Sequence, residues 1–226
     1  MRKIYVLAMA LFALCAVSFA GASSALAVSK ILAGGAEIGA GGIAARVTDE
    51  FLFEDMSATG KPDILCSKTW SITISAGGVT GQITAVLNLK NELVEDAATK
   101  GDLLECTATS TCSNPVDMIA TNLPWNIEVV LVGGTFVSLI LNGGAGQPGY
   151  TFDCNTIIGL LSDTCTGELG AILTNEAGGL LGEFSETNEA ITTPVNCTLG
   201  GEKQGLFAGT GFLVNLSGTG ALTVSE

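Results

Sequence analysis

Apolar and polar residues alternate along much of this chain with the period of two that marks β-strands. Residues 125–132 show the pattern best, with one apolar face that begins at Trp125. Gly133 and Gly134 then interrupt the run. A Gly-Gly pair supplies the positive φ angles of a two-residue hairpin, so residues 135–141 are predicted to pair antiparallel with the preceding strand.

The same alternation recurs from Phe51 and Phe53, which share one face of an early predicted strand, to the last residues of the chain. Trp70, Ile72 and Ile74 alternate with hydroxyl-bearing residues, which is typical of an antiparallel sheet with one buried face. Residues 91–101 are predicted as the one short helix, and residues 110–124 as a loop. We predict an all-β fold, a single antiparallel β-sandwich or barrel with about ten short strands and at most one short helix. A parallel β-solenoid is the second choice, but no fixed-period repeat is present.

The first 27 residues have the three regions of a secretory signal peptide. Arg2 and Lys3 precede an apolar run, and small residues follow it up to Ala27. The apolar run is short for a membrane span. We predict cleavage after Ala27 and a secreted or cell-surface protein, with no membrane span once the signal is removed.

Cleavage leaves a Gly/Ala-rich segment, residues 28–45, that is predicted to be a flexible leader, and a disulfide-linked β-sandwich domain, residues 46–226. The full chain has 9 basic and 22 acidic residues; without Arg2 and Lys3, seven basic residues face 22 acidic ones, a net charge of −15. Such a chain is repelled by phosphate, so no nucleic-acid partner is expected. A cell-envelope or glycan partner is compatible with this charge.

Six cysteines remain after cleavage, and an even number in an exported chain predicts three disulfides. Cys154 is predicted to pair with Cys165, because both lie on apolar faces of neighbouring strands. Cys106 is predicted to close a short loop with Cys112, which leaves Cys66 to pair with Cys197, although fifteen connectivities are possible. A zinc site is not expected, because no CxxC-type spacing is present.

The chain contains no histidine, which excludes Ser-His-Asp and Cys-His catalysis. A pair of carboxylates is the remaining enzymatic option, because glycoside hydrolysis needs only two acids. Glu128, Asp153 and Glu168 are the candidates on outward strand faces. The acidic loop at 183–189 is a candidate calcium site, with solvated acids as the alternative. No catalytic, cofactor-binding or metal residue is assigned.

Several short motifs together resemble exported bacterial all-β proteins with a few disulfides, a group of uncharacterised function. They are the Gly/Ala-rich leader, the C-x-x-x-W of Cys66 and Trp70, the entry Leu123, Pro124 and Trp125, the Cys154 and Cys165 pair, and the terminal Leu222, Thr223, Val224 and Ser225. The resemblance implies architecture and no activity. We expect an exported, non-enzymatic structural or binding module at or outside the cell envelope. The alternatives are a histidine-free carboxylate-dependent glycan hydrolase and an outer-membrane β-barrel.

Overall fold

The computed structural model describes eight stretches of the chain: residues 28–55, 63–87, 104–108, 113–156, 159–184, 195–198, 201–218 and 220–226. All regular structure in these stretches is β-strand, which confirms the predicted all-β class. Among the described residues, none forms a helix of the length and apolarity needed to cross a membrane. The predicted helix at 91–101 lies outside the described residues.

The described residues form sixteen strands, more than the ten or so that were predicted. They are β1 (Lys30–Ala33), β2 (Ala36–Glu37), β3 (Ile43–Asp55), β4 (Asp63–Ile74), β5 (Thr80–Leu87), β6 (Leu104–Ala108), β7 (Ser113–Thr121), β8 (Trp125–Val132), β9 (Thr135–Leu141), β10 (Gly149–Thr156), β11 (Gly159–Thr166), β12 (Leu169–Glu176), β13 (Gly179–Phe184), β14 (Val195–Cys197), β15 (Gly201–Asn215) and β16 (Leu222–Ser225). The segment 110–124, predicted as a loop, contains strand β7, so that prediction was wrong.

Thirteen of the strands form one antiparallel sheet that closes on itself twice. The first ring runs β13, β12, β9, β8, β5, β4, β3, β15 and back to β13; we call it the apolar barrel. The second runs β4, β6, β7, β10, β11, β14, β15, β3 and back to β4; we call it the cystine barrel. Closure leaves few open strand edges.

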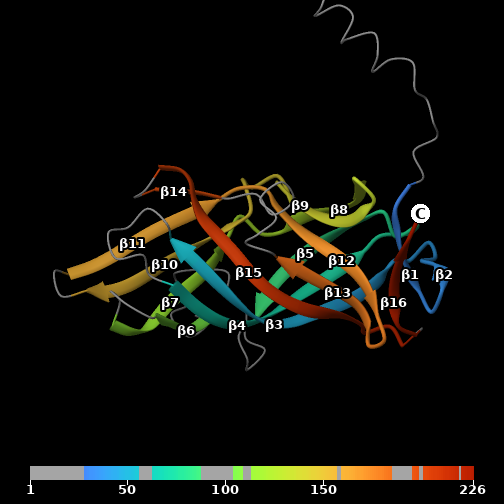
Figure 1. Ribbon diagram of the computed structural model, residues 1–226, viewed down its shortest axis with the longest axis horizontal. Helices are drawn as coiled ribbons and strands as arrows, with labels where there is room; N and C mark the ends of the chain where they lie inside the picture. Colours follow the sequence, from blue (N-terminus) through green and yellow to red (C-terminus); the bar gives the residue numbers. More distant parts are fainter. Residues whose placement is uncertain are drawn as a thin grey trace, which may run out of the picture.

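Strands β3, β4 and β15 belong to both barrels, and they are the three longest. Along β4, pairing with β6 ends at Cys66 and pairing with β5 begins at Thr69. Along β15, pairing with β14 ends at Gly205 and pairing with β13 begins at Gly209. The two barrels therefore lie end to end along the long axis of the molecule, with the shared strands running through both (Figure 1).

The central hairpin of the apolar barrel forms as predicted. Val132 pairs with Thr135, and Gly133 and Gly134 occupy the turn with φ angles of 58° and 87°. Trp125, Ile127 and Val129 of β8 are buried, which confirms the predicted face over these residues, whereas Leu131, next to the turn, is exposed. The alternation of the sequence therefore sets which side of each strand faces the interior.

A separate three-stranded sheet, in the order β16, β1, β2, closes one end of the apolar barrel. Ile31 of β1 and Leu222 and Val224 of β16 are buried in the main core. The side-chain amide of Asn175 donates to the Val224 carbonyl and accepts from the Val224 N–H, both at 2.8 Å, and so satisfies a backbone edge. Residues 28–45, predicted to be a flexible leader, instead form β1, β2 and the start of β3, because Ile31 supplies an apolar side chain that the barrel end buries.

Candidate functional site

Two disulfides are described, and neither follows the predicted pairing. Cys66 is bonded to Cys106, and Cys165 is bonded to Cys197. The predicted Cys154–Cys165, Cys106–Cys112 and Cys66–Cys197 pairs were therefore wrong. Cys112 lies outside the described residues, and Cys154 is described only as a backbone position of β10. Disulfides are typical of chains that fold in an oxidising compartment.

The register of the strands explains both bonds. Cys66 lies directly opposite Cys106 on antiparallel strands, and Cys165 directly opposite Cys197. The Cα separations are 4.4 and 4.0 Å, close to the spacing of a directly opposed antiparallel pair. Cys154 and Cys165 do share a hairpin, as predicted, but its register sets Cys165 opposite Tyr150 and Cys154 opposite Leu161. The two cysteine positions therefore lie at different levels along the hairpin.

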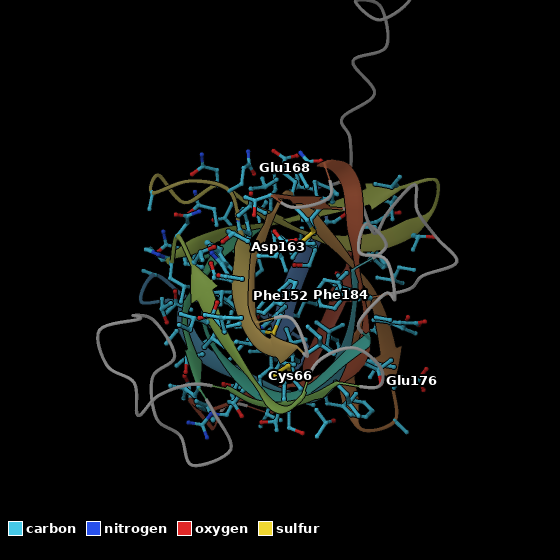
Figure 2. All side chains as sticks on the ribbon, turned by 90° about the vertical axis from the view of Figure 1, so that its left-hand side faces the viewer. Cys66, Phe152, Asp163, Glu168, Glu176 and Phe184 are labelled. Carbon is cyan, nitrogen blue, oxygen red and sulfur yellow. A yellow bond between two sulfur atoms is a disulfide. The ribbon has the colours of Figure 1, made fainter. Side chains whose placement is uncertain are left out.

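The interior of the cystine barrel holds a buried carboxylate, that of Asp163. It lies two residues before Cys165 on the inward face of β11 and is 1% exposed. Its Oδ1 accepts hydrogen bonds from the Thr164 N–H at 2.7 Å and the Thr198 hydroxyl at 2.5 Å. Figure 2 shows Asp163 and Phe152 inside the ring of strands. Burial of a carboxylate destabilises the fold unless the group is hydrogen-bonded or paired with a cation. The two hydrogen bonds to Oδ1 therefore offset part of that cost at Asp163.

The Cys66–Cys106 disulfide has a different kind of neighbour from Cys165, namely the thioether of Met118. The Met118 Sδ lies 3.3 Å from the Cys66 Sγ and 4.0 Å from the Cys106 Sγ. Since both cysteines are oxidised and carry no S–H, these are sulfur–sulfur packing contacts rather than hydrogen bonds. All three residues are buried. These three side chains thus form an uncharged cluster of polarisable sulfur atoms.

Aromatic rings fill the junction between the two barrels. The Trp70 indole N–H donates to the Tyr150 hydroxyl at 3.1 Å, and the Trp125 indole N–H donates to the Thr121 carbonyl at 2.7 Å. The Trp125 ring meets the Trp70 and Tyr150 rings edge-on, with centroids 6.2 and 5.6 Å apart. Such pairs add roughly 0.5–1.5 kcal/mol beyond area burial. The junction therefore couples β4, β8 and β10.

A buried lysine, Lys68, lies beside this cluster. It is 1% exposed, and its Nζ is 4.7 Å from the centroid of the Trp70 ring, the distance of a cation–π contact. Lys68 sits between the last β4 residue paired with β6 and the first paired with β5. Sequence reasoning missed both Lys68 and Asp163 as interior residues. The signal was present, since Lys68 falls in the inward alternation of Cys66 and Trp70, and Asp163 in that of Cys165.

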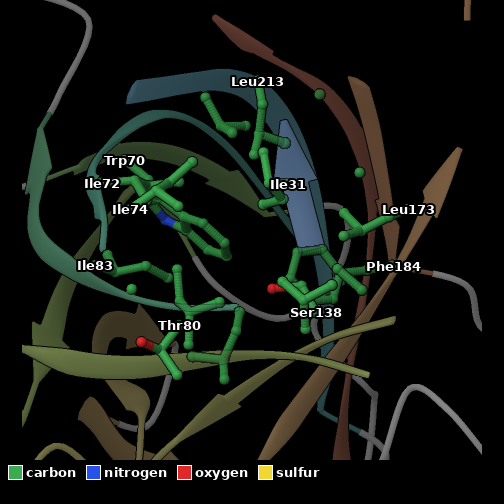
Figure 3. A pocket seen from close by; sticks show the side chains of 18 residues that line it. Ile31, Trp70, Ile72, Ile74, Thr80, Ile83, Ser138, Leu173, Phe184 and Leu213 are labelled. Carbon is green, nitrogen blue, oxygen red and sulfur yellow. The ribbon is translucent and has the colours of Figure 1, made fainter. Parts of the chain in front are cut away.

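The apolar barrel contains a small cavity of about 50 Å³ (Figure 3). Its lining is almost wholly aliphatic and aromatic, with Ile31 from the end sheet and Trp70 from the junction among its walls. For comparison, an apolar cavity of about 150 Å³ admits benzene. The interior of this barrel is therefore filled by its own side chains rather than shaped for a lipid-sized ligand.

A surface groove of about 410 Å³ runs over β5 and β8 on the outside of the apolar barrel. Gln82 and Asn126 line it and are hydrogen-bonded to each other at 3.0 Å, and Glu128 is the one carboxylate in its lining. Of the other predicted acids, Glu168 is exposed in the turn before β12, and Asp153 faces outward from β10 on the cystine barrel. No described groove brings two of the three predicted acids together.

The candidate calcium loop is only partly described. Glu183 lies in strand β13, opposite Ile172 and Thr210, and not in a loop as predicted. The rest of that segment, from residue 185 to 189, lies outside the described residues. Among the described residues, one group of three potential metal ligands comes together, namely Asp163, Cys165 and Cys197, with ligand atoms within 4.8 Å of one another.

Comparisons with known proteins give no match: no family model, no curated protein and no solved structure is similar to this chain.

Proposed function

We propose that this protein is an exported, non-enzymatic structural or binding module that acts at or outside the cell envelope. The observation that carries the proposal is the double closure of the sheet, in which two disulfides tie two of its strand pairs. Closure removes open strand edges, and each disulfide constrains the unfolded chain, so both features stabilise the fold outside the cytoplasm. Disulfide bonds are also a regular feature of exported domains.

The groove over β5 and β8 supports a binding role rather than hydrolysis. Amide and carboxylate groups of Gln82, Asn126 and Glu128 can hydrogen-bond to sugar hydroxyls. Glycoside hydrolysis, however, needs a second carboxylate about 5 to 10 Å from the first. Because Glu128 is the one carboxylate in the groove lining, a glycan is favoured as a bound partner over a hydrolysed substrate.

The distribution of side chains also disfavours the outer-membrane alternative. On β4 the inward residues Trp70, Ile72 and Ile74 are apolar and buried, while Ser71 and Thr73 face outward. Barrels that span the outer membrane have the opposite arrangement, with apolar residues toward lipid and a polar interior. The two faces of β4 thus favour a barrel with water outside, whereas β15 of the same barrel exposes Phe212 and Val214.

The proposal is tested with the exported, purified protein in two assays. In the first, it is mixed with a sedimented cell-envelope fraction, and we expect it to pellet with that fraction. In the second, it is incubated with a glycan panel, and we expect retention of some glycans without release of reducing sugar. Sugar release by the wild type that a Glu128→Gln variant loses would overturn the proposal in favour of the hydrolase. Partitioning of the protein into detergent would instead favour the outer-membrane alternative.

A further inference from the structure

Asp163, Cys165 and Cys197 form a compact donor set in the wall of the cystine barrel. Asp163 and Cys165 are alternate residues on the inward face of β11, and Cys197 lies opposite Cys165 on β14. All three are buried, and their ligand atoms lie within 4.8 Å of one another. They therefore converge without any rearrangement of the backbone.

We propose that, when the Cys165–Cys197 disulfide is reduced, these three residues bind a divalent metal ion of the zinc class. The inference is independent of the proposed function, since it concerns an interior site and not the outer groove. In the oxidised protein the two sulfurs are bonded to each other and cannot both bind a metal ion, whereas in the reduced protein both can serve as thiolate ligands.

The chemistry balances in two steps. First, a phosphine or dithiol reductant supplies two electrons, and two protons convert the disulfide into two thiols while the reductant is oxidised. Second, the metal ion displaces those two protons and binds two thiolates and one carboxylate. In zinc sites, metal–sulfur bonds of about 2.3 Å and metal–oxygen bonds of about 2.0–2.2 Å set the ligand atoms roughly 3.5–3.8 Å apart. That separation lies within the observed 4.8 Å limit once the sulfurs are no longer bonded.

The surroundings of Asp163 suit a metal ligand. The Thr198 hydroxyl and the Thr164 N–H both donate to Oδ1 and hold the carboxylate in place, which is the usual role of groups that surround a ligand. Two sulfurs and one oxygen form a borderline-soft donor set, which favours zinc, cobalt and cadmium ions. Calcium and magnesium, which prefer oxygen ligands alone, are disfavoured.

The Cys66–Cys106 disulfide provides a matched comparison within the same barrel. It has the same cross-strand arrangement and the same burial, but its close neighbour is the neutral Met118 thioether. A thioether adds no charge to balance a divalent cation. The carboxylate therefore distinguishes the proposed site from an ordinary pair of reduced cysteines.

The test uses the exported protein, reduced with a phosphine and desalted without oxygen, and then titrated with cobalt(II) alone. We expect one equivalent to bind with thiolate-to-cobalt charge-transfer absorption, which zinc displaces and excess calcium leaves unchanged. Asp163→Asn should weaken binding at least tenfold. The double variant Cys165→Ser with Cys197→Ser should abolish the absorption, whereas Cys66→Ser with Cys106→Ser should retain it.

Three results would overturn the proposal. They are charge-transfer absorption in the Cys165/Cys197 double variant equal to that of the reduced wild type, a cobalt affinity of Asp163→Asn equal to that of the wild type, or cobalt binding by the oxidised protein equal to that of the reduced protein. Reduction also has the potential to unfold the chain, and far-ultraviolet circular dichroism follows that event. Zinc that restores the sheet signal of the reduced wild type, but not of Asp163→Asn, supports the site because metal binding and folding are then linked. A reduced chain that neither binds cobalt nor refolds with zinc contradicts it.

Discussion

The apolar barrel and the cystine barrel share three strands but are held together by different means. The apolar barrel buries a continuous set of isoleucines, leucines and aromatic rings, and both of its described ends are covered. The cystine barrel contains the two shortest strands of the large sheet, β14 with three residues and β6 with five. Each of these short strands is tied to a neighbour by a disulfide, Cys197 to β11 and Cys106 to β4.

The comparison indicates where covalent bonds are needed in a closed sheet. A three-residue strand offers few ladder hydrogen bonds and little apolar area, so it contributes little to closure by itself. Among the described residues, the ladder between β14 and β11 comprises two residue pairs, Cys165 with Cys197 and Thr166 with Asn196. A disulfide at such a seam replaces the stabilisation that a longer strand would provide.

The junction belongs to both barrels, and its loss should have the largest effect. Trp125→Ala is expected to lower the free energy of unfolding by about 3–5 kcal/mol, out of a total of about 5–15 kcal/mol for a domain. Urea denaturation followed by circular dichroism and by the fluorescence of the remaining Trp70 should report it with both probes together. Phe212→Ala, on the exposed face of β15, is the control and should change stability by less than about 1 kcal/mol. A near-neutral Trp125→Ala would mean that the ring does not couple the barrels.

Removal of a disulfide should have a large but local effect. The bonds close loops with sequence separations of 32 and 40 residues, for which the loop-entropy estimate gives about 4 kcal/mol each. We expect Cys165→Ser with Cys197→Ser to accelerate amide hydrogen exchange in β11 while the β8–β9 hairpin stays protected. Equal acceleration in both barrels would show that they unfold as one unit and would contradict the comparison.

The number of free thiols tests whether the remaining cysteines are also bonded. Six cysteines follow the predicted signal peptide, and four are paired in the structure. Cys112 and Cys154 are the two that remain, and an even number of cysteines in an exported chain predicts that all are paired. We therefore predict a third disulfide between Cys112 and Cys154. Mass measurement after alkylation without reduction should show no added label, whereas two labels on these cysteines would refute the pairing.

Much of the fold follows from the sequence because alternation with period two is a local signal. The Gly133 and Gly134 hairpin, the burial of Trp125 and Trp70, and the all-β class are all confirmed. The disulfide pairing could not be obtained in the same way. It depends on strand order, and nothing local indicates that β6 returns to pair with β4 across 40 residues. The alternation also predicts interior positions for Asp163 and Lys68. These were missed because charged side chains are expected to face water.

The β8–β9 turn tests how much of the apolar barrel depends on backbone conformation rather than on packing. Gly134 has a φ of 87°, and a Cβ at this position would meet no atom within 4 Å. Gly134→Val should therefore cost about 1–3 kcal/mol from backbone strain alone. Gly134→Asn should cost less, because asparagine tolerates positive φ. Urea denaturation measures both, and equal costs would indicate steric conflict rather than strain.

The smallest effect is expected from the ion pair on the sheet that covers the end of the apolar barrel. Lys30 of β1 is paired with Glu37 of β2, and this hydrogen-bonded lysine lowers the pKa of the Glu37 carboxyl below its ordinary value. Both side chains reach the surface, so solvent and salt screen the attraction.

A carboxyl whose pKa is lower in the folded state stabilises the fold above its unfolded pKa, about 4.3 for glutamate, and loses that contribution as the pH falls through the folded value. Glu37→Gln should therefore differ from the wild type only slightly at pH 7 in low salt, and not at all at low pH or in high salt. Urea midpoints under these conditions measure the difference. A large loss at pH 7 that salt does not reduce would mean that the end sheet depends on this pair, whereas we expect burial of Ile31 and Leu222 to hold it in place.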